Sequence, residues 1–143
     1  MSALRLPYFK LSPEAYKGLS SVKEALDHSS LGHALIELVY LRVSQINGCA
    51  FCLDLHSKSL RKGGETATRL DQLTGWRVSS VYTERERAAL AWAEAVTHID
   101  TSGTEEAVFE PLKIHFTDAE ISDLTFAISL MNAFNRLAVS MRM

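Results

Sequence analysis

The sequence predicts an all-α fold, with a single compact helical domain of about six to seven helices. Apolar residues recur at three- and four-residue spacing through nearly the whole chain, as they do in amphipathic helices. Only three Pro and seven Gly interrupt this pattern in 143 residues, and no alternating polar and apolar run competes with it. The length suits one domain, so we expect residues 1–143 to form a single unit.

The first four helices are predicted from their ends. A Ser-Pro pair, a good N-cap followed by a good first residue, opens a helix over about 12–27. Residues 31–46 are apolar around most of the helix circumference and end at Asn-Gly, which predicts a central, buried helix. The next helix is expected over 49–62, before two glycines, and a short one over 65–73.

Two capping boxes open the remaining helices. Thr83 with Glu86 and Thr117 with Glu120 have the spacing at which hydroxyl and carboxylate satisfy each other's backbone amides. They predict helices over about 83–99 and 117–140. The last helix is apolar almost all round, so it is either central to the fold or faces another subunit, and we expect a homo-oligomer.

Charge and hydropathy narrow the class of partner. Fifteen Lys and Arg against seventeen Asp and Glu give a formal charge of −2, which leaves no basic surplus for phosphates or anionic lipid. No apolar run of about eighteen residues and no signal-like leader occurs. We therefore expect a cytoplasmic protein that binds neither nucleic acid nor membrane.

The candidate chemistry lies in the octapeptide CAFCLDLH. On a helix, Cys49, Cys52 and His56 fall at about 0°, 300° and 340°, one narrow face, whereas Asp54 points away. Cys49 stands at the helix start, where the free amides and the helix dipole favour a thiolate. His56 has an ordinary pKa close to physiological pH, so it can accept the thiol proton.

The same segment is open to other interpretations. Two cysteines can be small core hydrophobes, with His56 as a buried structural histidine. Zinc also binds Cys and His, but three ligands spread over about 10 Å of one helix converge poorly on one ion. Leu53 stands where haem attachment needs histidine, and the preceding helix excludes a thioredoxin-like strand. We expect a redox dithiol with no metal and no organic cofactor.

Glu37 is the fourth candidate. Polar side chains repeat along the predicted helix over 31–46 as His33, Glu37, Tyr40 and Ser44. This stripe is either a solvated face, or it turns Glu37 toward the next helix, where it could exchange a proton with His56.

The four residues share a pattern, E-x11-C-x-x-C-x3-H, that resembles the alkyl hydroperoxidase D-like branch of the carboxymuconolactone decarboxylase superfamily. The similarity covers roughly residues 15–140. It includes the stretches SQINGCAFCLDLHSKSLRKGG, TERERAALAWAEAVT and MNAFNRLAV. The resemblance implies an alkyl hydroperoxidase D-like helical fold that assembles into trimers or hexamers.

The resemblance also implies roles. Cys52 would attack peroxide, Cys49 would resolve the sulfenic acid into a disulfide, and Glu37 with His56 would relay protons. Phe51 departs from the best-studied members of the branch, which have histidine immediately before the second cysteine. The decarboxylase side of the superfamily lacks the paired cysteines.

Together these observations predict a thiol-dependent peroxidase or dithiol–disulfide oxidoreductase of antioxidant defence. Its partners would be a hydroperoxide substrate and an unidentified thiol reductant, such as a lipoyl or thioredoxin-like protein. The alternative is a non-enzymatic oligomeric module whose dithiol senses oxidants or binds a metal.

Overall fold

The computed structural model describes residues 3–101 and 103–143. Over these residues the fold is all-α, with eight α-helices, one 3₁₀ helix and no strand, as the sequence predicts. The helix count slightly exceeds the predicted six to seven. In chain order the elements are α1 (Tyr8–Leu11), α2 (Pro13–Asp27), α3 (His33–Asn47), α4 (Ala50–Lys62), α5 (Ala67–Gln72), η1 (Leu73–Val78), α6 (Glu84–Thr97), α7 (Glu106–His115) and α8 (Asp118–Met141).

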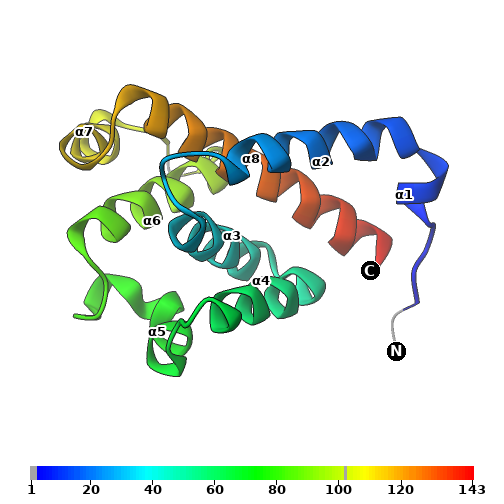
Figure 1. Ribbon diagram of the computed structural model, residues 1–143, viewed down its shortest axis with the longest axis horizontal. Helices are drawn as coiled ribbons and strands as arrows, with labels where there is room; N and C mark the ends of the chain where they lie inside the picture. The colour runs from blue at the N-terminus through cyan, green and yellow to red at the C-terminus, as the bar shows by residue number, and fades with distance from the viewer. Residues whose placement is uncertain (1–2, 102) are drawn as a thin grey trace.

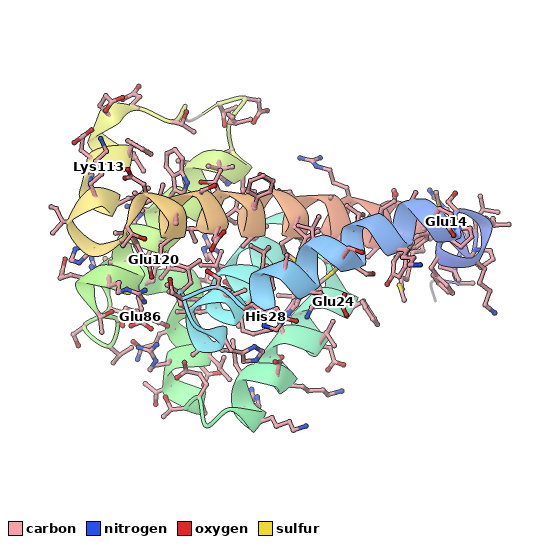
Figure 2. All side chains as sticks on the ribbon, turned by 45° about the horizontal axis from the view of Figure 1, so that its top comes forward. Glu14, Glu24, His28, Glu86, Lys113 and Glu120 are labelled. Atoms are coloured by element: carbon pink, nitrogen blue, oxygen red, sulfur yellow. A yellow bond between two sulfur atoms is a disulfide. The ribbon has the colours of Figure 1, made fainter. Side chains whose placement is uncertain are left out.

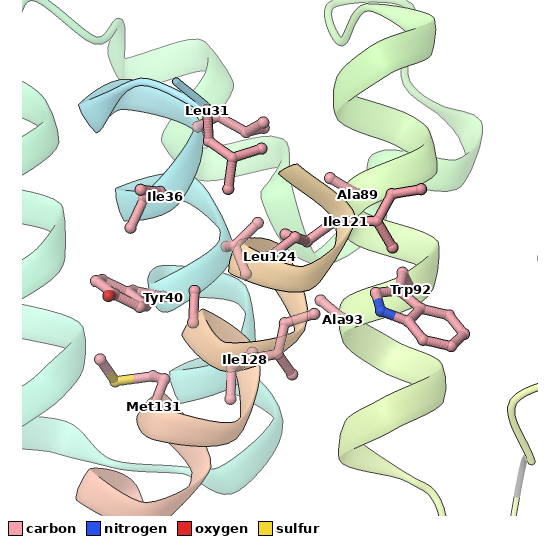
Figure 3. Close-up of a cluster of buried hydrophobic side chains, with 14 of the residues drawn as sticks. Leu31, Ile36, Tyr40, Ala89, Trp92, Ala93, Ile121, Leu124, Ile128 and Met131 are labelled. Carbon is pink, nitrogen blue, oxygen red and sulfur yellow. The ribbon is translucent and has the colours of Figure 1, made fainter. Parts of the chain in front are cut away.

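Helices α3 and α8 form the centre of the fold. α3 packs against α4, α6 and α8, while α2 runs along α8 on the opposite side (Figure 1). The α8 side chains Leu124 and Ile128 are fully buried between α3 and α6, beside Tyr40 on one side and Ala93 on the other (Figure 3). Most of the apolar surface predicted for α3 and α8 is therefore buried by contacts within the chain.

Both predicted capping boxes are present. Thr83 and Thr117 each accept a hydrogen bond from the backbone of the glutamate three residues on, and each glutamate side chain accepts one in return. These reciprocal bonds fix the starts of α6 and α8, which explains why the sequence locates those starts well.

The structure differs from the prediction in two additional helices, α1 and α7, and in a helix break between α5 and η1. Helix α7 contains Pro111, which removes one backbone donor and hides the helical pattern in the sequence. It forms because it packs on α6, with Leu112 fully buried and Phe109 against Trp92 at 5.5 Å between ring centroids. The short α1 is also additional, and the helix predicted over 65–73 divides into α5 and η1.

In the part of the chain that the structure describes, no helix is long and apolar enough to span a bilayer.

Candidate active site

The site begins at the junction of α3 and α4. Gly48 caps α3 with a φ of 65°, in the left-handed region that glycine adopts without strain. The next residue, Cys49, is the N-cap of α4, and its sulfur accepts a hydrogen bond from the Cys52 amide at 3.3 Å. A single glycine thus reverses the chain, so that α4 packs back along α3.

Cys49 and Cys52 are joined in a disulfide within the first turn of α4 (Figure 2). Cys49 is only 1% exposed and Cys52 only 4%, and both pack with Ala138 of α8. The first turn of a helix presents free backbone amides and the positive end of the helix dipole. This position favours the thiolate form of either sulfur once the disulfide is reduced.

His56 and Glu37 form a buried pair across the two helices. His56 Nδ1 lies 2.7 Å from Glu37 Oε2, and their side chains are 4% and 6% exposed. A carboxylate only accepts, so Nδ1–H donates to it and the Nε2 of the imidazole is left for other chemistry. The pair therefore has the arrangement in which a carboxylate orients a histidine that acts as acid or base.

The polar stripe on α3 is not a solvated face. Of its four residues only His33 is exposed, with Nε2 at 3.4 Å from Ser59 Oγ. Glu37, Tyr40 and Ser44 are all buried.

Tyr40 packs directly behind the histidine. Its ring centroid lies 5.2 Å from that of His56, and its hydroxyl is buried without a hydrogen-bond partner among the described residues. Burial, and secondarily the nearby charge of Glu37, raises the pKa of Tyr40 far above its ordinary value. The hydroxyl consequently stays protonated, an unused donor next to the His56–Glu37 pair.

A network of asparagines ties α8 to the end of α3. Asn135 is fully buried, donates to Ser44 Oγ at 3.0 Å and accepts from Asn47 Nδ2 at 3.1 Å. Asn132 accepts from the same Asn47 amide at 2.9 Å. The sequence analysis missed these residues, although polar Asn in the apolar segment MNAFN was a usable signal. The network fixes the residues that immediately precede Cys49.

A cavity of about 220 Å³ opens beside the disulfide. Its walls come from α1, α2, α4, α8 and the C-terminal residue, and they are mostly apolar. The lining residues are Tyr8, Tyr16, Ser20, Lys23, Phe51, Cys52, Leu55, His56, Met131, Phe134, Ala138 and Met143. Cys52 and His56, one helical turn apart, are thus accessible from the same space. Most of the walls come from segments that the sequence analysis did not connect to the site.

The described residues contain no group of three or more His, Cys, Asp or Glu side chains arranged to hold a metal ion.

Comparisons with known proteins agree with this architecture. The profile of the carboxymuconolactone decarboxylase family matches residues 13–95. The uncharacterised protein YdfG of Bacillus subtilis is 33% identical over 137 residues, which cover 96% of this chain and 93% of YdfG.

Two solved structures share the fold. A protein of unknown function from Agrobacterium tumefaciens, which carries the name of the antioxidant defence protein AhpD, superposes with a TM-score of 0.94. It is 44% identical, over 98% of this chain and 96% of that one. A peroxidase-related protein from Ralstonia eutropha with an alkylhydroperoxidase AhpD core has a TM-score of 0.82 and 25% identity, over 94% and 72% of the two chains.

Proposed function

Because the chain belongs to the carboxymuconolactone decarboxylase family and is AhpD-like, we propose that it is a thiol-dependent peroxidase or dithiol–disulfide oxidoreductase of antioxidant defence. One observation carries the proposal: the buried His56–Glu37 pair belongs to the same helix junction as the Cys49–Cys52 disulfide, and His56 shares a cavity with Cys52. Thiol peroxidase chemistry needs at least a redox-active dithiol and a positioned base that can accept the thiol proton.

The oxidative half of the cycle starts from the dithiol. His56 takes the proton of Cys52, and the thiolate attacks the outer oxygen of the hydroperoxide. The O–O bond breaks, Cys52 becomes a sulfenic acid, and the alkoxide leaves as an alcohol with the proton from His56. Cys49 then attacks the Cys52 sulfur, which forms the disulfide and releases hydroxide as water with the Cys49 proton.

The reductive half needs two electrons from outside. An external dithiol attacks the disulfide, forms a mixed disulfide and closes its own disulfide, which restores both cysteines. We propose a lipoyl or thioredoxin-like protein for this step. We also propose that the cycle operates in the cytoplasm, whose thiol pools keep such reductants available.

Turnover with single-cysteine variants tests the proposal. Peroxide loss is followed with dithiothreitol as reductant for the wild type, Cys52→Ser and Cys49→Ser. Cys52→Ser should abolish peroxide reactivity, whereas Cys49→Ser should undergo one oxidation that cannot resolve into an internal disulfide. Equal residual turnover in both variants would contradict the assigned roles. A wild type that oxidises once and does not cycle would be a sensor and not an enzyme.

We further propose a homo-oligomer, a trimer or hexamer. Large apolar side chains remain on the surface, including Phe126 on α8 at 60% exposed and Ile114 on α7 at 78%. Light scattering at micromolar concentration should give a multiple of 15.9 kDa, and a monomer would contradict the proposal.

A further inference from the structure

The cavity beside Cys52 has one wall made of aromatic rings. Tyr8 of α1, Tyr16 of α2 and Phe134 of α8 all line it. The Tyr8 and Tyr16 ring centroids lie 6.2 Å apart at 62°, and those of Tyr16 and Phe134 lie 6.0 Å apart at 68°. This edge-to-face series, which we call the aromatic wall, connects the first two helices with α8 at the other end of the chain. A further ring added to such a series gains the same kind of contact.

The other lining residues indicate how a ligand is oriented in the cavity. Cys52 and His56 on α4 supply the reactive groups, and the same helix places Phe51 and Leu55 at the cavity, 42% and 49% exposed. These half-exposed apolar side chains form the entrance, and the reactive pair lies deeper. A ligand therefore enters across an apolar rim with its reactive oxygen toward α4.

Two polar side chains of the cavity outside the reactive pair have partners within the chain. Lys23 Nζ lies 3.7 Å from Asp27 Oδ1, and the Tyr8 hydroxyl donates to Met143 Sδ at 3.1 Å. An anionic ligand would have to compete with Asp27 for Lys23, the cation of this lining, whereas a neutral ligand needs no such exchange.

The size of the cavity agrees with a ring. An apolar protein cavity of about 150 Å³ binds benzene. At about 220 Å³ this one has space for a phenyl group together with a short branched carbon bearing the reactive oxygen. Hydrogen peroxide would leave most of the aromatic wall without contact.

We propose that the aromatic wall makes this cavity a binding site for neutral hydroperoxides that carry an aromatic ring, with Tyr16 and Phe134 as specificity-determining residues. The inference rests on the proposed peroxidase function and names its substrate class. The ring lies against the aromatic wall while Cys52 attacks the outer oxygen. The aryl alcohol is the leaving product, formed with the proton from His56.

Two peroxides that differ only in the ring test the proposal. Cumene hydroperoxide carries a phenyl group where tert-butyl hydroperoxide carries a methyl. With dithiothreitol as reductant, kcat/KM should favour the phenyl compound by at least about tenfold, because the aromatic contact adds to the extra apolar burial of the ring. Tyr16→Leu and Phe134→Leu should each remove most of this preference, because they lower kcat/KM for the phenyl compound much more than for tert-butyl hydroperoxide.

Matched variants separate recognition from folding. Tyr16→Phe keeps the ring and should keep the preference. Phe109→Leu removes an aromatic contact with Trp92 in the core, away from the cavity, and should also keep it. Equal rates for the two peroxides in the wild type, or equal losses for both in the leucine variants, would overturn the proposal.

A binding measurement distinguishes this inference from the proposed function. The product alcohol 2-phenylpropan-2-ol and its methyl counterpart tert-butanol are titrated into the disulfide form, and shifts of protein NMR signals are followed. If no peroxide turns over, the proposed function fails, yet tighter binding of the phenyl alcohol, lost in Phe134→Leu, would still support the aromatic site. Equal binding of both alcohols would refute the site.

Discussion

Replacing Glu37 by Gln separates a proton-relay role from a structural one. Glu37 Oε2 accepts from His56 Nδ1 at 2.7 Å, and both side chains are almost completely buried. Glutamine has nearly the same shape, and its carbonyl oxygen can accept the same hydrogen bond. The substitution therefore removes the negative charge and the proton-accepting group while leaving the contact in place.

The expected effect on stability is small. A hydrogen bond to a charged group contributes about 1.5–3 kcal/mol and a neutral one about 0.5–1.5 kcal/mol, so Glu37→Gln should cost about 1 kcal/mol. If the proton that His56 takes from Cys52 is passed on to Glu37, the variant instead loses the final proton acceptor. Loss of a general base slows a reaction about 10²–10⁴-fold, or about 2.7–5.4 kcal/mol in activation free energy.

The measurement pairs urea unfolding with peroxide turnover over about pH 6 to 9. We expect a folded variant with turnover reduced at least about a hundredfold. Glu110→Gln is the control, since Glu110 is 58% exposed and its ion pair with Lys113 lies on the surface. It should change stability by less than about 0.5 kcal/mol and leave turnover unchanged. Wild-type turnover of Glu37→Gln across this range would refute the relay.

Two further predictions concern stability. Tyr40→Phe removes a buried hydroxyl that has no hydrogen-bond partner among the described residues, so the free energy of urea unfolding should rise by about 1 kcal/mol, and a fall would show that the hydroxyl is bonded. Burial opposes ionisation of Glu86, but hydrogen bonds from Arg69 and from the Thr83 amide outweigh it and hold the pKa below its ordinary value of 4.5. Because folding lowers the pKa of Glu86, its ionised carboxylate stabilises the folded chain above pH 4.5. This stabilisation is lost as the pH falls through the lowered pKa, so wild-type stability should decline in acid. Glu86→Gln, which keeps the capping box, should show a flatter decline, and identical slopes would contradict this.

The local half of the site could be predicted from the sequence. Cys52 and His56 lie on α4, so their relative placement follows from helical geometry, and Cys49 immediately precedes this helix as its N-cap. The position of Glu37 relative to His56 is harder to predict, because it depends on how the chain turns at Gly48. The Asn-Gly signal predicts that α3 ends there, but not that α4 folds back to bring Glu37 within 2.7 Å of His56.

The walls of the cavity could not be predicted, because they depend on contacts between distant segments. Tyr8 donates to Met143 and packs on Tyr16, a contact set that joins the two ends of the chain. No local pattern marks these residues. Helix α7 could not be predicted for a different reason. Pro111 interrupts its helical sequence pattern, and packing on α6 is what makes the helix favourable.

Helix α8 shows why an all-round apolar helix need not face a partner. Its inner side packs against α3 and α6, and α2 covers a further side. Near its end, Asn135 holds the end of α3, Phe134 joins the aromatic wall and Ala138 packs on the disulfide. One helix thus connects the core to the reactive cysteines, which accounts for most of its apolar surface within a single chain. The apolar surface that oligomer formation would have to bury is therefore smaller than the all-round apolar surface predicted for this helix. On α8 it includes the exposed side chains of Phe126 and Val139.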